Sequence, residues 1–345
     1  MIITDSQSVL VLGGGSWGTA LAILLANASK RQVKLWVRNQ AHSLAMQNTA
    51  SNEAYLPGIA FPENLSVCDS DTLIGDDNEH TLFLLVVPSH AFRASIETLK
   101  ASLDRSGRDL STVTVLWGTK GFDPQTNELL SEVARDILGH QPTLGVVTGP
   151  SFAKETANGL PTALVLASEK EGDAQALAQL FKTNSTRVYP STDIVGAQLG
   201  GAVKNVIAVA AGISDGLGFG ANARTALITR GLAELTRFGA ALGGKMETFM
   251  GLSGMGDLVL TCTDDQSRNR RLGLGVGAGR SAQEVIAEIG QEVEGFNTTK
   301  ELYKKANALG ISMPITEQVY AVLHEGRDPK EAVQLLLSRK TATEL

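Results

Sequence analysis

The stretch SVLVLGGGSWGTALAILLANA, residues 8–28, determines the fold that we expect for this chain. The apolar run Val9–Leu12 has the composition of a buried strand, and Trp17–Ala28 has the apolar content of a buried helix. The glycines Gly13 to Gly15 separate the two, and another glycine follows at Gly18. Because glycine permits sharp turns and close approach to the backbone, this segment predicts a strand, a tight turn and a helix.

Gly13, Gly15 and Gly18 match the pattern G-x-G-x-x-G of dinucleotide-binding turns. The first glycine permits the turn, the second lets the backbone approach a pyrophosphate, and the third lets the helix pack closely on the strand. Backbone N–H groups of Ser16 and Trp17, at the start of the helix, are candidate phosphate donors. The position of the motif, within a β-α-β unit, predicts a dinucleotide site, and a glycine-rich turn without a ligand is the alternative.

The end of the second predicted strand, Gln32–Val37, bears on which cofactor is bound. An acidic residue that binds the ribose 2′-OH is expected here, but this chain has Arg38. A guanidinium group suits a 2′-phosphate, so the sequence favours NADPH, with NADH also possible. The alternative is an arginine exposed in a loop. His42, close by in the sequence, is a candidate to assist Arg38 or is simply exposed.

The first half of the chain alternates apolar runs with helix-like stretches. Further strands are predicted at Thr81–Val87, Thr112–Trp117, Leu144–Val147 and Thr162–Ala167, and helices at Ala41–Asn48, Phe92–Ser102, Leu129–Leu138 and Asp173–Phe181. This alternation predicts a mostly parallel sheet that helices cover on both faces. The segment Ala54–Asn64 is predicted to be a loop because of its prolines and glycine.

The pattern changes after about Pro190 and becomes helical. Helices are predicted at Ile194–Ala211, Thr225–Leu242, Ala282–Ile289, Thr298–Leu309, Thr316–Glu325 and Pro329–Leu337. We therefore expect an α/β Rossmann-like dinucleotide-binding domain over residues 1–192. An all-α domain that binds substrate and carries the catalytic groups is expected over residues 193–345.

Composition excludes several other classes of protein. The net charge of −6 is unlike that of most nucleic-acid-binding proteins, although local cations can still bind a small anion. The only cysteines, Cys68 and Cys262, do not have the spacing of a disulfide framework or a zinc site. The sequence shows no signal peptide and no apolar run of about 18 residues, so we expect a cytoplasmic protein without a membrane span.

Chemistry-bearing residues follow three of the predicted strands, whose carboxyl ends share the edge at which ligands bind. The motif VVPSH, residues 86–90, places His90 there, as a candidate acid or as a surface residue. Lys120 follows the next strand and is a candidate to contact a phosphate, a carbonyl oxygen or the cofactor, although most lysines are simply exposed. Small residues that suit an anion or carbonyl site follow the strand after that: Gly149, Ser151 and Ala153.

Lys204 and Asn205 lie in a predicted helix that is otherwise built from glycine and apolar residues. A buried charge is costly unless it is paired or used, and burial lowers the pKa of a lysine, which suits acid–base chemistry. Asp257 is the candidate counter-ion. A planar guanidinium group and two hydrogen-bonding side chains, suited to a phosphate, lie in the run SRNRR: Ser267, Arg268 and Asn269. The alternatives are a lysine whose stem reaches solvent and a solvated basic face.

At these residues the chain resembles the bacterial NAD(P)-dependent glycerol-3-phosphate dehydrogenase family. The resemblance covers nearly the whole chain and is carried, in order, by GGGSWGTALA, VVPSH, TKG, GPSFAKE, GGAVKN, GFGANARTALITRG, GDLVLTCT and SRNRR. It implies a Rossmann-like domain followed by a helical domain, in a protein that is usually a homodimer. It also implies the reversible reduction of dihydroxyacetone phosphate, a triose phosphate, to sn-glycerol 3-phosphate for phospholipid synthesis.

The resemblance also implies roles for individual residues, with no metal required. Lys204 matches the catalytic acid/base, which protonates the alkoxide that forms on hydride transfer, while Lys120 and Asp257 complete the catalytic group. The substrate positions are Lys120, Gly149, Ser151, Lys204, Asp257, Ser267, Arg268 and Asn269. The cofactor positions are Gly13, Gly15, Ser16, Trp17, Gly18, Arg38, Lys120, Ala153, Arg268, Glu292 and Glu294.

Two other functions remain as alternatives. A reductase for another small oxo-acid, of the 3-hydroxyacid or ketopantoate type, shares the two domains and the lysine but does not require the cationic run SRNRR. A sensor that binds NADPH without turnover leaves Lys204 and Asp257 unexplained. Turnover that requires a phosphorylated substrate would exclude the oxo-acid reductase. Any turnover at all would exclude the sensor.

Overall fold

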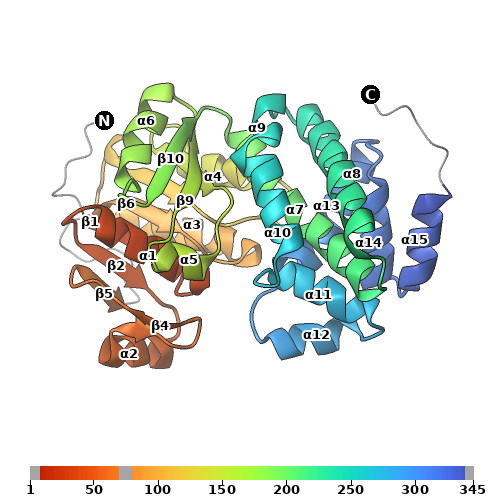
Figure 1. Cartoon of the computed structure of the whole chain (residues 1–345). Helices are drawn as coiled ribbons and strands as arrows, with labels where there is room; N and C mark the ends of the chain where they lie inside the picture. The colour runs from red at the N-terminus through yellow and green to blue at the C-terminus, as the bar shows by residue number, and fades with distance from the viewer. Residues whose placement is uncertain (1–7, 70–79, 339–345) are drawn as a thin grey trace. The chain divides into compact units, whose positions relative to one another are not determined.

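The computed structural model describes residues 8–69 and 80–338 (Figure 1). The chain divides into two compact units, Met1–Gln198 and Leu199–Leu345. The division falls inside the helix α7 (Ile194–Gly216), which begins in the first unit and continues through the second.

The first unit contains an eight-stranded sheet with the strand order β10-β9-β8-β7-β6-β1-β2-β5. Its strands are β1 (Ser8–Leu12), β2 (Val33–Trp36), β5 (Leu65–Cys68), β6 (His80–Leu85), β7 (Thr114–Trp117), β8 (Thr143–Thr148), β9 (Thr162–Ser168) and β10 (Thr186–Ser191). Its helices are α1 (Ser16–Ala28), α2 (Gln40–Thr49), α3 (Ser89–Arg105), α4 (Leu130–Leu138), α5 (Ala153–Ala157) and α6 (Glu171–Leu180).

The order of the strands reverses at β1, which is the central fact for function. The chain proceeds outward from β1 to β2 and β5, then returns to the other side of β1 and continues through β6 and β7 to β8, with all these pairs parallel. In sheets of this kind ligands bind at the carboxyl ends of the strands beside the point of reversal. The glycine turn that follows β1 lies at that point. Only the pairing of β8 with β9 is antiparallel among the described strands of this sheet.

Apolar side chains cover both faces of the sheet. On one face, side chains of α1 and α6 pack with strand residues such as Val9 and Leu35. On the other face, side chains of α3 and α4 pack with Leu10, Phe83 and Trp117. Because both faces are buried, the central strands are apolar throughout, which is the pattern that predicted a mostly parallel sheet. The predicted α/β Rossmann-like fold class of the first domain is confirmed.

Four strands escaped the sequence analysis. The predicted loop Ala54–Asn64 in fact contains β4 (Leu56–Ala60), which pairs with the short β3 (Ser51–Asn52) in a small antiparallel sheet. The edge strands β5 and β10 give no long apolar run, because β5 has only four residues and β10 includes Thr186, Arg187 and Ser191. β10 also contains Pro190, and a proline is tolerated in a strand at the edge of a sheet.

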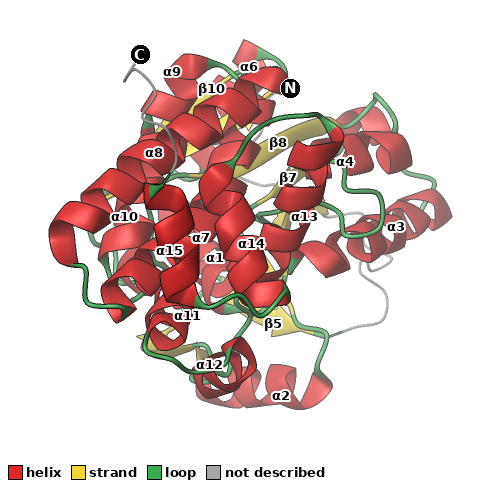
Figure 2. Ribbon diagram, turned by 90° about the vertical axis from the view of Figure 1, so that its right-hand side faces the viewer, coloured by secondary structure: helices red, strands yellow, loops and turns green. Residues whose placement is uncertain are grey.

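The described part of the second unit is built from helices, as predicted (Figure 2). After α7 come α8 (Gly220–Ala241), α9 (Met246–Met250), a π-helical turn (Leu252–Gly256), α10 (Asp257–Thr263), α11 (Arg268–Gly277), α12 (Ala282–Ile289), α13 (Glu294–Ala308), α14 (Pro314–His324) and α15 (Pro329–Leu337). The short α9 to α11 were not predicted, because their glycines and polar residues give a weak helical pattern.

The helix α7 is the core of the second unit. It is long and apolar enough to cross a membrane by length and composition, but 94% of its most apolar window is buried inside the structure. The helix α11 packs unusually close to it, because glycines face carbonyl groups at the crossing. A Cβ atom at Gly212 would lie 2.2 Å from the carbonyl oxygen of Arg270, and one at Gly273 would lie 2.1 Å from that of Val209.

Candidate active site

The glycine turn after β1 has the geometry of a phosphate cradle. Gly13 has φ of 122°, and a Cβ atom there would lie 2.4 Å from the carbonyl oxygen of Val86. A Cβ atom at Gly18 would lie 2.0 Å from the carbonyl oxygen of Gly13, so helix and turn are in direct backbone contact. In contrast, a Cβ atom at Gly15 would meet nothing within 4 Å. The second glycine of the motif therefore faces open space beside the backbone, where a pyrophosphate group fits.

The start of α1 offers donors to an anion in that space. Gly15 is the residue that precedes the helix, and no side chain caps it. An uncapped helix N-terminus carries partial positive charge, and its N–H groups bind phosphates well. The hydroxyl of Ser16 donates to the carbonyl oxygen of Tyr55 at 2.8 Å. The indole of Trp17 packs beside Gly118 at the end of β7, and its Nε1 is buried without a hydrogen-bond partner in the described structure.

Asn52 supports this turn, and sequence analysis missed it. The residue is fully buried, and its Nδ2 donates to the carbonyl oxygen of Gly14 at 2.9 Å and to the hydroxyl of Thr19 at 2.8 Å. A ring nitrogen of His42 lies 3.0 Å from Oδ1 of Asn52. The sequence offered only an asparagine just before the predicted loop, because its burial depends on the tertiary fold. His42 therefore braces the glycine turn through Asn52.

Arg38 lies two residues beyond the end of β2, on the same edge of the sheet as the glycine turn. Its side chain is exposed, and it forms no hydrogen bond or ion pair with residues of the described structure. An exposed guanidinium group at this position is available to a phosphate at the ribose end of a dinucleotide.

The carboxyl ends of β6 and β7 place the next candidates. His90 is exposed in the first turn of α3, which favours the surface alternative for this residue. Lys120 follows β7 and is partly buried. The hydroxyl of the preceding Thr119 donates to the carbonyl oxygen of Val87 at 2.8 Å, so the two strand ends are tied together.

The segment after β8 is shaped by its backbone. Gly149 has φ of 124°, and a Cβ atom there would lie 3.0 Å from the carbonyl oxygen of Ala163 on β9. The hydroxyl of Ser151 donates to the carbonyl oxygen of Gly149 at 3.0 Å. Ala153 begins the short α5 and packs against the apolar cluster beneath α1. Because β1, β6, β7 and β8 are parallel, these residues share an edge with the glycine turn.

Lys204 forms a buried ion pair with Asp257. Only 4% of Lys204 and 1% of Asp257 are exposed, and Nζ of the lysine donates to Oδ1 of the aspartate. Nζ also donates to the hydroxyl of Thr261 at 3.0 Å, and that hydroxyl donates to the carbonyl oxygen of Asp257 at 2.6 Å. The predicted counter-ion is thus in place, and Thr261, which sequence analysis missed, adds a second oxygen. It lies one helical turn after Asp257, a spacing that was the available signal.

The surroundings of this pair are apolar enough to affect a neighbouring thiol. Burial raises the pKa of the Cys262 thiol to about 12, although the positive charges of Lys204 and Arg270 act in the opposite direction. Cys262 is therefore an inert, neutral core residue. Lys204 is therefore held away from solvent, where electrostatic interactions are stronger than in water.

Asn205 and Asn269 link three helices beside the ion pair. Nδ2 of Asn269 donates to Oδ1 of Asn205 at 2.9 Å, and Oδ1 of Asn269 accepts from the backbone N–H of Gly295 at 2.9 Å. Nδ2 of Asn205 donates to Oε2 of Glu294 at 3.2 Å. Both amide groups therefore hold α7, α11 and α13 together, and Glu294 lies within this network. The predicted Glu292 is exposed and accepts from Asn297 at 3.4 Å.

The run SRNRR forms the start of α11 and is only partly a solvated face. Ser267 caps the helix by accepting from the N–H of Arg270 at 3.2 Å. Arg268 is partly exposed, and its Nη1 donates to Gln291 at 3.4 Å, a weak contact. Arg270 is buried and pairs with Asp215 at 3.0 Å. The structure thus separates an anchoring arginine, Arg270, from one that a ligand can reach, Arg268.

Each unit therefore assembles one group of the predicted residues. In the first unit these lie along the carboxyl edge of the sheet, and in the second they lie around Lys204 and the start of α11. Among residues 8–69 and 80–338, no group of three or more His, Cys, Asp or Glu is arranged to hold a metal ion.

Comparisons with known proteins show which family the chain resembles over its length. The family described as NAD-dependent glycerol-3-phosphate dehydrogenase matches with its N-terminal part over residues 8–174 and with its C-terminal part over residues 193–334. A glycerol-3-phosphate dehydrogenase [NAD(P)+] of Pseudoalteromonas translucida is 52% identical over 342 residues, which is 99% of each chain. One of Colwellia psychrerythraea is 51% identical over 337 residues, 97% of this chain and 98% of that one. The crystal structure of glycerol-3-phosphate dehydrogenase from Coxiella burnetii is 44% identical, has a TM-score of 0.91, and covers 97% of this chain and 100% of its own.

Proposed function

The chain belongs to the NAD-dependent glycerol-3-phosphate dehydrogenase family and is an oxidoreductase that uses a nicotinamide cofactor, and we propose that NADPH is the one it prefers. Its reaction is the reversible reduction of dihydroxyacetone phosphate to sn-glycerol 3-phosphate, which supplies phospholipid synthesis. The proposal extends to the roles of individual residues, with residues 1–192 holding the cofactor and residues 193–345 carrying the catalytic lysine.

One observation carries the catalytic part of the proposal: the buried pair of Lys204 and Asp257 in an otherwise apolar helix. A buried ion pair adds little stability compared with apolar residues of similar size, so the pair calls for another reason to be present. Acid–base chemistry is such a reason, because it requires an ammonium group held in a fixed direction in a dry site.

The residues of the glycine turn fit a dinucleotide. The open space at Gly15, the uncapped start of α1 and the close backbone contacts at Gly13 and Gly18 leave room and donors for a pyrophosphate. Arg38 suits a 2′-phosphate because a guanidinium group binds phosphate strongly. When bound, the nicotinamide group supplies the hydride that reduces the C2 carbonyl of the substrate.

The chain's own groups handle the proton and the negative charge. Lys204 donates a proton from Nζ to the substrate oxygen as negative charge develops on it, and accepts that proton in the reverse direction. Asp257 and Thr261 hold Nζ in a fixed direction, which lowers the entropy cost of the step. Lys120 polarises the same oxygen with its positive charge.

The phosphate group of the substrate is assigned to the start of α11, where Arg268 supplies the planar cation and Ser267 and Asn269 add polar groups. Gly149 and Ser151 are proposed as substrate positions because the resemblance implies them. Binding energy from the phosphate orients the carbonyl carbon, so it contributes to the rate as well as to affinity. We further propose a homodimer, as the resemblance implies, and a location in the cytoplasm, as the sequence analysis expects.

The test is the rate of NADPH oxidation by the purified protein with three substrates: dihydroxyacetone phosphate, unphosphorylated dihydroxyacetone and ketopantoate. We expect fast turnover with the phosphorylated triose only. Turnover with ketopantoate alone would assign the protein to the oxo-acid reductases, and tight NADPH binding without any turnover would support a sensor.

Variants test the residue roles. Lys204→Met is expected to lower kcat about 100-fold or more while NADPH binding is kept, because a general acid contributes about that factor or more. Lys330→Met, which removes an exposed lysine from α15, serves as the matched control and is expected to be fully active. Wild-type rates in both Lys204→Met and Lys120→Met would refute the proposed mechanism.

A further inference from the structure

Lys120 is presented to solvent by a frame of buried residues. Residues 113–119 and 121–123 are all buried, and Lys120 is the one residue between them that is partly exposed. Before Lys120 in the chain lies β7, which is paired with β6 and β8 in the sheet. On the other side is the loop of residues 121–129, which turns back so that Phe122 bridges Leu129. The position of Lys120 therefore depends on what holds this loop.

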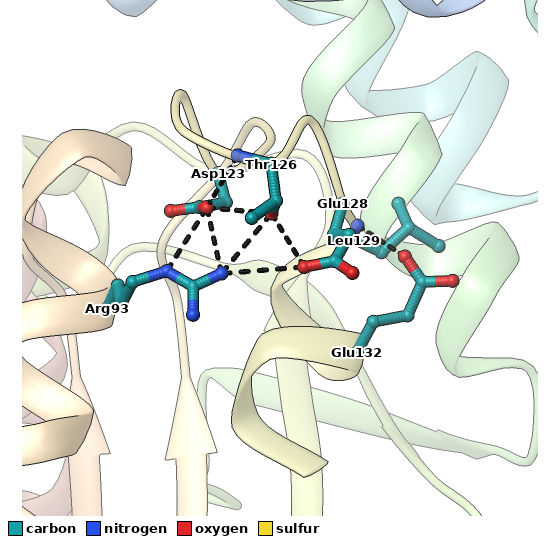
Figure 3. Close-up of polar contacts among 6 residues, drawn as sticks. All are labelled: Arg93, Asp123, Thr126, Glu128, Leu129 and Glu132. Atoms are coloured by element: carbon teal, nitrogen blue, oxygen red, sulfur yellow. Dashed lines mark hydrogen bonds and ion pairs between the residues drawn. The ribbon is translucent and has the colours of Figure 1, made fainter. Parts of the chain in front are cut away.

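Backbone hydrogen bonds from the N–H of Asp123 to the carbonyl oxygen of Glu128 at 3.0 Å and from the N–H of Asn127 to that of Asp123 at 2.8 Å close the loop, and one carboxylate oxygen ties it to α3 (Figure 3). Oδ2 of Asp123 accepts hydrogen bonds from Nε of Arg93 at 3.2 Å and from Nη2 of Arg93 at 2.9 Å. The same oxygen accepts from the backbone N–H of Thr126 at 3.1 Å and from its hydroxyl at 2.8 Å. Figure 3 shows Arg93 on one helix, Asp123, Thr126 and Glu128 on the loop, and Glu132 on the helix that follows the loop.

Two further contacts complete the network around Asp123. Nη2 of Arg93 also reaches Oε2 of Glu128 at 3.4 Å, and that oxygen lies 2.6 Å from the hydroxyl of Thr126, whose single proton Asp123 and Glu128 share. Where the loop ends, the side chain of Glu132 accepts from the N–H of Leu129 at 2.7 Å and so fixes the start of α4. The loop is thus fastened at both of its ends.

Arg93 connects this loop to the neighbouring strand end. It lies in the second turn of α3, which begins directly after the segment Val86–Pro88 at the end of β6. The hydroxyl of Thr119 donates to the carbonyl oxygen of Val87 and so links the segment after β7 to the segment after β6. Lys120 therefore lies between two ties, one through Thr119 and one through the pair of Arg93 and Asp123.

The ion pair is desolvated enough to be rigid. The side chain of Asp123 is 2% exposed and that of Arg93 is 20% exposed. Burial opposes ionisation of Asp123, but the hydrogen bonds from Arg93 and Thr126 outweigh it and hold the pKa of the carboxyl below its ordinary value. A buried charge that loses its partner is costly, so the native geometry of the pair is strongly preferred.

We propose that Arg93 and Asp123 form a positioning pair that fixes Lys120 at the edge of the sheet. The pair touches neither substrate nor cofactor; it acts through the backbone of residues 121–123. The inference rests on the proposed function, in which Lys120 polarises the substrate oxygen. A shift of about 1 Å in such a group is enough to lower a rate about 100-fold, so a tie of this kind matters for the reaction.

A double-mutant cycle in the full-length enzyme tests the proposal. It compares wild type, Asp123→Asn, Lys120→Met and the double variant, measuring kcat/KM for dihydroxyacetone phosphate and the melting temperature of each. Asp123→Asn is expected to lower kcat/KM about 10- to 100-fold, because the amide loses the charge and cannot hold both arginine nitrogens in the same way. In the Lys120→Met background the same substitution is expected to change kcat/KM less than about twofold, because the group that it positions is gone.

Glu169→Gln is the matched control. It breaks another arginine–carboxylate pair of the first unit, in which Arg135 Nη2 lies 2.6 Å from Glu169 Oε1. Because β9 runs antiparallel to β8, Glu169 follows β9 at the edge opposite to Lys120. We expect this variant to keep the wild-type kcat/KM. A loss equal to that of Asp123→Asn would mean that any broken ion pair impairs the enzyme, and would refute the positioning role.

The outcomes separate this inference from the proposed function. An equal fold-loss from Asp123→Asn with and without Lys120 refutes the positioning role, since the effect then does not pass through Lys120. An impaired Lys120→Met beside a fully active Asp123→Asn refutes it as well and leaves the proposed function intact. A fully active Lys120→Met removes the role of Lys120 and therefore refutes the positioning inference, while the proposed reaction and the role of Lys204 stand. If Asp123→Asn does not fold, Arg93→Gln replaces it, because Asp123 then keeps its bonds to Thr126.

Discussion

Glu234 gives the second unit a pH-dependent stability that the structure allows us to estimate. Its side chain, on α8, is buried and accepts hydrogen bonds at the start of α14: from the N–H of Ile315 at 2.6 Å, the N–H of Thr316 at 3.2 Å and the hydroxyl of Thr316 at 3.1 Å. Burial raises the pKa of Glu234 from 4.5 to about 7, although these hydrogen bonds and the charge of Arg237 act in the opposite direction.

The direction of the effect follows from proton linkage. Between pH 4.5 and 7 the folded protein keeps a proton on Glu234 that the unfolded chain releases. The contribution of this residue to the free energy of unfolding is therefore fully present below pH 4.5 and is lost as the pH rises through about 7. At about 1.4 kcal/mol per unit of pKa, the loss is about 3 kcal/mol.

Glu234→Gln removes this dependence, because glutamine stays neutral and keeps an acceptor oxygen for the start of α14. We expect the variant and the wild type to differ by about 3 kcal/mol more at pH 8 than at pH 4.5, with the variant the more stable at high pH. Urea unfolding at several pH values measures this difference, and amide hydrogen exchange at residues 313–324 localises it. Glu317→Gln, in the first turn of α14, is the control. A difference between Glu234→Gln and wild type that stays constant with pH would refute the reasoning.

The remaining predictions concern packing, cofactor choice and thiol chemistry. Gly212→Ala is expected to lower the free energy of unfolding by about 1–3 kcal/mol, because its Cβ would lie 2.2 Å from a carbonyl oxygen. Gly172→Ala, whose Cβ would meet nothing within 4 Å, is the control and should not be destabilising when the two are compared by urea unfolding. Arg38→Ala is expected to raise the Kd of NADPH at least about tenfold and leave that of NADH unchanged in fluorescence titrations, and an equal change for both would contradict the 2′-phosphate role. Cys262, whose thiol pKa is about 12, is expected to resist iodoacetamide until the protein unfolds, while the partly exposed Cys68 reacts slowly in the native state; fast native labelling at Cys262, read by mass spectrometry, would show that the site is wet.

The sequence was sufficient for the parts of the fold that depend on local pattern. Continuous apolar runs such as Thr81–Val87 predicted central strands, because a strand buried on both faces has no polar side. The edge strands β5 and β10 were missed because β5 is only four residues long and β10 carries polar residues such as Thr186 and Arg187. The antiparallel pairing of β8 and β9 was also beyond prediction, because the direction of a strand is set by its connection and not by its composition.

The candidate site shows the same division between local and long-range information. Lys204 was found because a lysine stands out in an apolar helix, and Asp257 because a buried cation requires an anion. Thr261 and Asn52 were missed, because serine, threonine and asparagine are common on surfaces and their burial depends on the tertiary fold. The pair of Arg93 and Asp123 was missed because thirty residues separate its members.

Glycines where α7 and α11 cross determine how the polar groups beside Lys204 are placed. Asn205 faces Asn269, Val209 faces Gly273 and Ile213 faces Gly277, so the two helices run in the same direction with matching steps of four residues.

The Cβ atoms that Gly273 and Gly277 lack would lie 2.1 Å and 2.3 Å from carbonyl oxygens of α7. An added methyl group would have to push the helices apart, and the hydrogen bond of 2.9 Å between the two asparagines has little room to lengthen. Glycine lowers the helix propensity of α11, which is why that helix was hard to predict. The same glycines bring Ser267, Arg268 and Asn269 close to the helix that carries Lys204, so the weak helical pattern follows from the geometry that the proposed substrate site needs.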